Sequence, residues 1–132
     1  MTERILKLHE EGRDNELGYE AMELTTIVAE AARIVKLKNG PEKYEFTINA
    51  LSLGDIALVF FPGEPFVEIG RRVIAESPFK MTLACAITNG GGTYFPTTAA
   101  FEEGGYEVRS SSLKKGVDNL LVEGSAELLN GF

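Results

Sequence analysis

Two short apolar runs on either side of a helical pattern restrict the folds open to this chain. Residues 56–61 and residues 81–87 are nearly continuous apolar segments of strand length. The stretch between them has apolar residues at the spacing of one helix face, at Phe66, Ile69 and Val73. A strand, a helix and a strand joined by short links form a right-handed crossover, which makes the two strands parallel. The sequence therefore predicts a βαβ unit, with a helix that Pro65 opens.

A further strand is expected just before this unit. Apolar and polar residues alternate over residues 44–50, which is typical of a strand with one wet face. The short link through Gly54 and Asp55 makes this strand and the strand at residues 56–61 an antiparallel hairpin. Because residues 56–61 are apolar on both faces, we expect that strand in the middle of the sheet. The fold class expected is α/β, with a mixed sheet that combines an antiparallel hairpin and a parallel βαβ unit and is flanked by helices.

Other parts of the chain carry helical patterns of apolar residues and capping signals. We expect these helices at residues 2–11, 19–36, 98–103 and 116–130. The last of them is expected to bury Val117, Leu120, Leu121 and Leu128. With 132 residues, of which 44% are hydrophobic, the chain has the size and composition of a single domain, residues 1–132.

Charge and hydropathy argue against several classes of partner. The formal net charge is −7, and both nucleic acids and anionic membrane surfaces attract basic patches instead. No apolar run approaches the roughly 20 residues that span a bilayer. No apolar signal region follows residues 1–4. We therefore expect neither a transmembrane segment nor a signal peptide in this chain, and the compartment stays open.

Cysteine and histidine are too scarce to complete a catalytic zinc site. Cys85 is the only cysteine, so no internal disulfide can form, and its apolar surroundings favour a buried structural thiol. His9 is the only histidine and lies on a polar N-terminal helix. Hydrolytic zinc sites usually take about three protein ligands, often two of them histidines. This chain cannot supply such a set by itself.

Two candidate metal ligands follow the predicted parallel strands. Ligands in open α/β sheets bind at the carboxyl ends of such strands. Glu64 follows residues 56–61, and Tyr94 follows residues 81–87, so both side chains approach one edge if the strands are neighbours. Glu64 precedes a helix, whose N-terminus favours an ionised carboxylate. The alternatives are a surface carboxylate at Glu64 and sheet-edge aromatic rings at Tyr94 and Tyr106.

The glycine-rich stretch at residues 89–92 is a weaker candidate. Successive backbone N–H groups in such a stretch can form an anion-binding nest. It lacks the spacing and the lysine of a phosphate-binding loop, so nucleotide binding is poorly supported. A flexible connection is the simpler interpretation.

Several short motifs occur together in a characteristic order. They are Pro62-Gly63-Glu64 followed by Gly70-Arg71-Arg72, then Asn89-x-x-x-x-Tyr94-x-x-Thr97 with Phe101-Glu102, and then Tyr106-Glu107. In this order and spacing the chain resembles the neutral/alkaline, non-lysosomal ceramidase family. No single motif is specific, and the likeness rests on their combination. It covers most of the chain and is strongest over residues 54–107.

The resemblance implies a zinc-dependent amidohydrolase that cleaves the N-acyl amide of ceramide-like lipids. It implies that Glu64 and Tyr94 are zinc ligands and that Tyr106 helps to hold the reacting carbonyl. The family's two histidine ligands belong to an earlier part of its catalytic domain, which has no counterpart here. The resemblance thus implies that this chain corresponds to the C-terminal part of a larger catalytic domain. By itself it is expected to be inactive and to bind little or no zinc.

The sequence also leaves a second interpretation open. Gly90, Gly91 and Gly92 replace bulkier residues of the family, and Glu64 and Tyr94 are 30 residues apart, closer than in its best-known members. The alternative is a non-enzymatic α/β interaction module that pairs with another chain or with itself. The partner polypeptide expected is the missing N-terminal part of the catalytic domain or a second copy in a homo-oligomer, with residues 24–35 and the sheet edge in contact.

Overall fold

The computed structural model describes residues 1–88 and 90–132 of the chain. These residues form two compact units, Met1–Tyr44 and Glu45–Phe132. Each unit has its own internal contacts, and the expectation of a single domain stays a prediction.

The N-terminal unit is a helical pair. Helix α1 (Thr2–Glu10) contacts helix α2 (Ala21–Lys38), and the short 3-10 helix η1 (Asp14–Glu16) lies in the connection. The buried hydrophobic residues of this unit are Ile5, Leu8 and Ala31. Both helices predicted for this region are confirmed, with small shifts at their ends.

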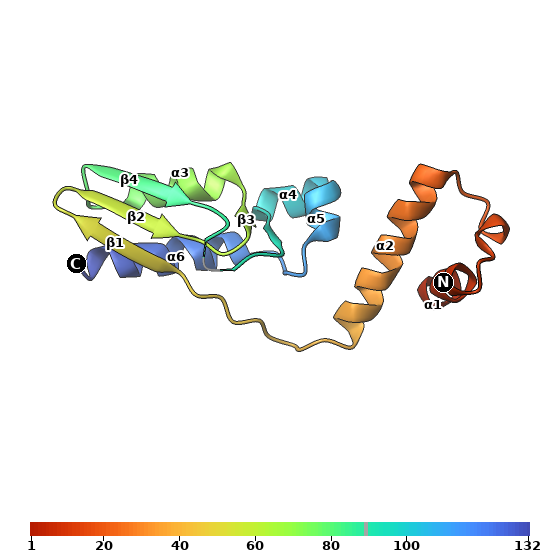
Figure 1. The fold of residues 1–132 in the computed structure, drawn as a ribbon. Helices are drawn as coiled ribbons and strands as arrows, with labels where there is room; N and C mark the ends of the chain where they lie inside the picture. Colours follow the sequence, from red (N-terminus) through yellow and green to blue (C-terminus); the bar gives the residue numbers. More distant parts are fainter. Residues whose placement is uncertain (89) are drawn as a thin grey trace. The chain divides into compact units, whose positions relative to one another are not determined.

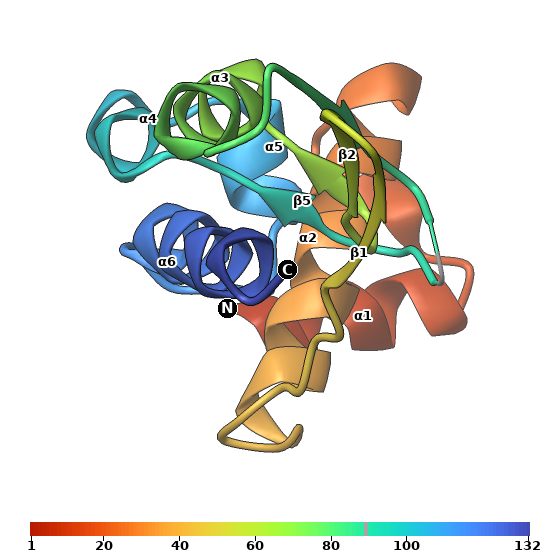
Figure 2. The same cartoon turned by 90° about the vertical axis from the view of Figure 1, so that its left-hand side faces the viewer.

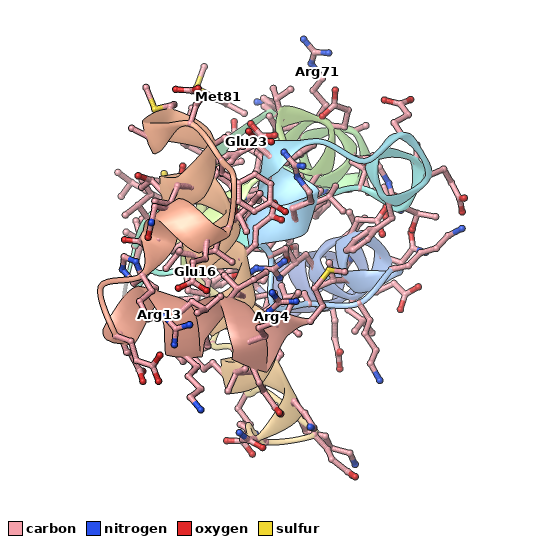
Figure 3. The ribbon with its side chains drawn as sticks, turned by 90° about the vertical axis from the view of Figure 1, so that its right-hand side faces the viewer. Arg4, Arg13, Glu16, Glu23, Arg71 and Met81 are labelled. Carbon is pink, nitrogen blue, oxygen red and sulfur yellow. The ribbon has the colours of Figure 1, made fainter. Side chains whose placement is uncertain are left out.

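Arg13 organises the connection between these helices. Its Nε and Nη2 donate to the Glu16 carboxylate at 2.6 and 2.9 Å, and its Nη1 donates to Glu11 at 2.6 Å (Figure 3). His9 Nδ1 lies 2.8 Å from a carboxylate oxygen of Asp14. All of these groups are solvent-accessible, so each pair contributes little to stability.

The C-terminal unit is a two-layer α/β arrangement (Figure 1). Its main sheet has the order β1–β2–β4, formed by β1 (Asn49–Leu53), β2 (Ile56–Phe60) and β4 (Met81–Cys85). Strand β1 is antiparallel to β2, and β4 is parallel to β2 with helix α3 (Val67–Glu76) between them in the chain. The structure therefore confirms the α/β class, the mixed sheet and the central position of β2.

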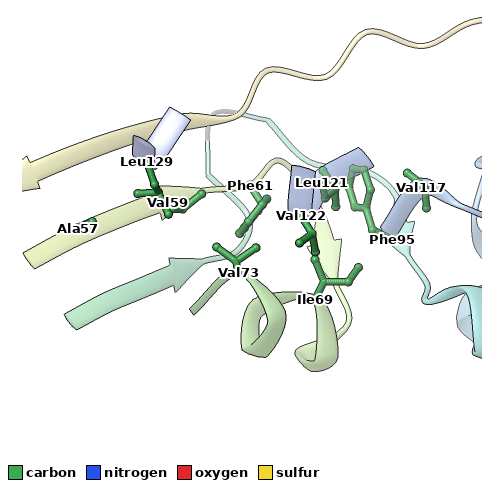
Figure 4. Packing of buried hydrophobic residues seen from close by; sticks show 10 residues of the cluster. All are labelled: Ala57, Val59, Phe61, Ile69, Val73, Phe95, Val117, Leu121, Val122 and Leu129. Atoms are coloured by element: carbon green, nitrogen blue, oxygen red, sulfur yellow. The ribbon is translucent and has the colours of Figure 1, made fainter. Parts of the chain in front are cut away.

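Within the described residues of the C-terminal unit, the helices that pack on this sheet cover one of its faces. Helix α3 contacts β4 and helix α6 (Val117–Asn130), and α6 contacts β1. Figure 2 shows α3 and α6 on the same side of the strands. The buried cluster between the two layers consists of Ala57, Val59, Phe61, Ile69, Val73, Phe95, Val117, Leu121, Val122 and Leu129 (Figure 4). Burying a large aliphatic or aromatic side chain contributes about 1.5–3 kcal/mol, so this cluster is the main stabilising feature of the unit.

The observed helix α6 uses a different face from the expected one. Of the four residues expected to be buried, Val117 and Leu121 are buried, whereas Leu120 and Leu128 are exposed; Leu129 is buried in addition. The apolar residues of this helix lie on two neighbouring faces, one of which also carries Asp118 and Ser125, so its sequence leaves more than one stripe open. Packing against the sheet and α3 selects the stripe that is buried.

Strand β1 lies later in the chain than the alternating pattern predicts. The prediction of a strand at residues 44–50 is wrong, since the paired residues run from Asn49, opposite Phe60, to Leu53, opposite Ile56. The alternating pattern still predicts the buried face correctly, because its apolar residue Ile48 packs against the core. Pairing with β2 continues up to the turn at Gly54, and hydrogen bonding to that neighbour decides where the strand begins and ends.

A second, smaller parallel pair continues from the ends of β2 and β4. It consists of β3 (Glu64–Pro65) and β5 (Tyr94–Phe95). Pro65 therefore lies in a strand, and the helix that it was expected to open starts two residues later. Two-residue strands have no detectable periodicity, so only the fold reveals them.

Two short helices follow β5. Helix α4 (Thr98–Glu103) has the predicted bounds, and Thr97 Oγ1 caps it by accepting from Ala100 N at 3.1 Å. Helix α5 (Tyr106–Ser110) was not expected from the sequence. Over the parts of the chain that are described, no helix is long and apolar enough to cross a membrane.

Candidate functional site

Glu64 and Tyr94 lie directly opposite each other on neighbouring strands. In the parallel pair β3–β5, Glu64 is the register partner of Tyr94. Glu64 N donates to Thr93 O at 3.0 Å, and Phe66 N donates to Phe95 O at 3.1 Å, which holds the two segments together. The two side chains expected at one sheet edge are thus neighbours, and their role as metal ligands stays a prediction.

Gly63 makes this close approach possible. Its backbone has φ +66°, and a Cβ at this position would lie 2.4 Å from Thr93 O and 3.0 Å from a ring carbon of Phe95. Only glycine avoids both the left-handed strain and the contact with the neighbouring backbone. The glycine in Pro62-Gly63-Glu64 therefore has a packing reason of its own, which the sequence motif did not disclose.

The phenol of Tyr94 lies in an acidic environment. The negative charge of Glu64 is the largest cause that raises the pKa of Tyr94, followed by partial desolvation and by Tyr106 and Glu107. The phenol is therefore protonated at neutral pH when only these groups surround it. A cation bound beside Glu64 would offset the carboxylate charge and favour the phenolate.

Tyr106 joins this pair from helix α5. Its ring packs edge-to-face against the ring of Tyr94, with 6.1 Å between the ring centroids. Tyr106 is mostly exposed to solvent, and it follows Gly105, whose φ is +110°. The fold thus brings Tyr106 to Tyr94, and Tyr94 to Glu64, from three separate segments.

Serine and threonine side chains connect strand β5 by hydrogen bonds to the segment that follows helix α5. Ser111 Oγ donates to Tyr94 O at 2.8 Å and accepts from Leu113 N at 3.2 Å. Thr93 Oγ1 accepts from Ser112 N at 3.3 Å. Sequence reasoning did not find these supporting residues, because no pattern near them signals a contact across 17 or more residues.

A second polar cluster lies at the start of α6. The carboxylate of Asp118, only 3% exposed, accepts from Thr98 N at 3.1 Å, from Thr98 Oγ1 at 2.7 Å and from Arg72 Nη1 at 3.3 Å. Burial by itself raises the pKa of Asp118, but the hydrogen bonds from Thr98 and Asn119 and the charge of Arg72 together outweigh it. The net result is a lowered pKa. This cluster is structural, since its members satisfy one another and the start of the helix.

Glu64 and Tyr94 provide two oxygen donors that fit half of a zinc site. Carboxylate oxygen is an ordinary zinc ligand, and zinc is usually four-coordinate. Within residues 1–88 and 90–132, no group of three or more His, Cys, Asp or Glu side chains could hold a metal ion. A zinc site built on Glu64 and Tyr94 would need further ligands beside these two.

Cys85 and the glycine-rich stretch do not add to this site. Cys85 is half-buried, not fully buried as its sequence suggested, because its side of the sheet has no helical cover. Asn89, which begins the glycine-rich stretch, lies outside the described residues, so the anion-binding nest stays a prediction.

Comparisons with known proteins do not narrow this picture. No protein-family model, no curated protein and no solved structure matches the chain. The site residues and the motifs that they belong to are therefore the basis of the function proposed below.

Proposed function

We propose that this chain is part of a zinc-dependent amidohydrolase resembling the neutral ceramidases. In this proposal, Glu64 and Tyr94 bind the zinc ion and Tyr106 contacts the reacting amide. The observation that carries it is the parallel pairing of Glu64 with Tyr94, with the ring of Tyr106 packed against Tyr94. These are the residues of the Pro-Gly-Glu, Asn-x-x-x-x-Tyr and Tyr-Glu motifs, brought together from segments up to 42 residues apart.

Each of these side chains has a distinct chemical task. A bound zinc ion supplies an acidic water and polarises a carbonyl oxygen near neutral pH. Glu64 contributes an anionic oxygen donor, and Tyr94 contributes a phenol that can donate or accept a proton. The Tyr106 hydroxyl can donate a hydrogen bond to the substrate's carbonyl oxygen as negative charge develops on it. The substrate class proposed is the N-acyl amide of a ceramide-like lipid.

Another polypeptide segment must complete the site. Two donors are about half of a tetrahedral set, and the chain's only histidine, His9, belongs to the N-terminal unit. The chain as it stands is therefore proposed to bind zinc only weakly and not to hydrolyse amides.

The first test is a zinc titration of the 132-residue chain by calorimetry, with the absorbance of tyrosinate recorded in parallel. We expect weak binding that is lost in Glu64→Gln and in Tyr94→Phe. Glu68→Gln is the matched control, because it removes a nearby carboxylate from the first turn of α3. Wild-type zinc affinity in Glu64→Gln would remove the central residue of the proposal. Tight one-to-one binding that survives substitution of His9 would show that the ligands are different ones.

The second test measures amide hydrolysis in the protein that carries the complete site. Glu64→Gln is expected to lose zinc and activity together. Tyr106→Phe is expected to keep its zinc content and to lower kcat on the order of 10²–10³-fold, as the loss of one oxyanion donor does. Full activity of Glu64→Gln on a ceramide-like amide would refute the enzymatic role.

An interaction module is the second candidate function. It is favoured by the uncovered face of the main sheet, whose exposed large apolar side chains are Leu51, Leu53, Ile56, Met81 and Leu83. Contiguous apolar surface beyond a few hundred Å² usually marks a contact site. A protein with the complete site that neither binds zinc through Glu64 nor hydrolyses amides, but associates through this face, would favour this function over the enzymatic one.

A further inference from the structure

Strand β4 forms an unprotected edge of the main sheet. Its only partner strand among the described residues is β2. Residues Met81–Cys85 contain neither a charged residue nor a proline. Sheet edges usually carry such residues because a plain edge pairs readily with another strand.

The backbone groups on the outer side of β4 are those of Thr82 and Ala84. Met81 N donates to Asp55 O at 3.3 Å and Phe61 N donates to Cys85 O at 2.8 Å, so the odd-numbered residues of β4 bond to the β2 side. In a parallel ladder the alternate residues direct their N–H and C=O groups to the opposite side. Thr82 and Ala84 therefore offer donors and acceptors to a further strand.

An apolar groove runs beside this edge, between β4 and α3. It has a volume of about 340 Å³, and its lining includes Phe66, Val67, Gly70, Ile74, Thr82 and Ala84. The side chains of β4 on this side are small, and a Cβ at Gly70 would lie 3.3 Å from that of Ala84. Helix α3 and strand β4 thus approach each other closely at Gly70 and Ala84.

Helix α3 presents a second apolar stripe along this groove. Val67 is 60% exposed and Ile74 is 48% exposed, and Gly70 lies between them at helical spacing. Ile69 and Val73 form a different stripe, which is buried in the core. An amphipathic surface helix needs only one apolar stripe, so the second one is not explained by packing within this unit.

We propose that the β4 edge and the exposed stripe of α3 form the interface of a symmetric homodimer. Two copies of β4 pair antiparallel about a twofold axis at Leu83. Thr82 then lies opposite the partner's Ala84, and each such pair exchanges both of its backbone hydrogen bonds. The same axis sets the two α3 helices antiparallel over the joined sheet, so that their exposed stripes cover each other.

A second copy satisfies this surface better than an unrelated segment does. A twofold axis pairs the same edge with itself and leaves neither edge open. Val67 and Ile74 are exposed on the α3 side of this edge, and Met81 and Leu83 are exposed on the opposite face of the sheet, so pairing of two β4 strands brings apolar side chains together on both faces.

Charge does not oppose this arrangement at the contact itself. Although the chain carries a net charge of −7, no carboxylate lines the groove. Arg71 is the one charged residue that lines it, and its side chain extends outward from the ribbon (Figure 3). The proposal is independent of zinc, so failure of the metal test leaves it standing.

Sedimentation velocity of the full chain across the micromolar range tests the interface. We expect a dimer for the wild type. Ile74→Lys charges the α3 stripe, and Leu83→Lys places two like charges at the axis, so each is expected to raise the dissociation constant on the order of 30-fold or more. Leu51→Lys is the matched control, because Leu51 is 55% exposed on the same face of the sheet and lies on the far strand. It is expected to leave the dimer intact.

Amide hydrogen exchange supplies an independent readout within β4. In the dimer the amides of Thr82 and Ala84 are expected to exchange slowly, and in Ile74→Lys they are expected to exchange quickly. The Leu83 amide, bonded to β2, is protected in both. Weak dimers form at protein concentrations up to about 100 μM. A wild-type protein that stays monomeric at that concentration would overturn the proposal. So would a dimer that Leu51→Lys abolishes and Ile74→Lys leaves intact, which would indicate face-to-face sheet packing.

Discussion

Replacing Gly63 by alanine tests whether the close approach of β3 to β5 holds Glu64 beside Tyr94. At φ +66°, a residue with a Cβ costs about 1–2 kcal/mol in backbone strain. The added Cβ would also lie 2.4 Å from Thr93 O, so one of the two strands must move. That movement breaks the bond from Glu64 N to Thr93 O, a net loss of about 1 kcal/mol. We therefore expect Gly63→Ala to lower the free energy of unfolding by about 3 kcal/mol or more.

Gly54→Ala separates strain from contact. Gly54 has φ +59°, nearly that of Gly63, but nothing lies within 4 Å of a Cβ built there. This variant is expected to lose only the strain of about 1–2 kcal/mol. The difference between the two variants measures the close approach of the strands.

Urea unfolding followed by circular dichroism gives the two free energies. Each kcal/mol corresponds to a shift in Tm of roughly 4–8 °C for a domain of this size. Gly63→Ala is also expected to change the near-ultraviolet signal of the packed rings of Tyr94 and Tyr106, and Gly54→Ala is not. If the two variants lose the same stability, the strand contact at Gly63 is not what holds the site together.

Two further predictions concern titrating groups. The Glu64 charge is the main cause of the raised pKa of Tyr94, so Glu64→Gln is expected to lower that pKa in an ultraviolet absorbance titration. Tyr94→Phe identifies which part of the absorbance signal belongs to Tyr94. An unchanged titration in Glu64→Gln would contradict the assignment. The pKa of Asp118 is lowered in the folded chain, so its stabilising contribution is present above the unfolded value of about 3.9 and disappears as the pH falls through the folded value. Asp118→Asn is expected to cost about 1.5–3 kcal/mol at neutral pH and to flatten the acid limb of the stability profile, and an equally steep limb in that variant would refute this.

Much of the C-terminal unit follows from local patterns. The apolar runs that became β2 and β4 have strand length, and the residues between them have helical spacing, so the crossover and the parallel pairing could be predicted. The same topology made Glu64 and Tyr94 neighbours, because the ends of parallel strands meet at one edge. These features depend on periodicity and chain connectivity, which the sequence carries directly.

Other features of the site could not be predicted from the sequence, because they depend on contacts between distant segments. The register pairing of Glu64 with Tyr94 depends on Gly63, whose lack of a side chain matters only once Thr93 lies against it. The carboxylate of Asp118 meets Thr98 and Arg72 from two other segments, and no short-range pattern connects them.

Burial of the sheet is likewise determined in part by the sequence and in part by the packing of the helices. The run at residues 56–61 is apolar on both faces, and its sequence predicts a central strand, as observed. Which face is covered was decided by α3 and α6, which pack on the side of Val59 and leave Leu51 and Leu83 of the neighbouring strands exposed on the other. A residue's own chemistry sets its preference for an apolar neighbour, whereas the arrangement of whole elements determines whether that neighbour is present.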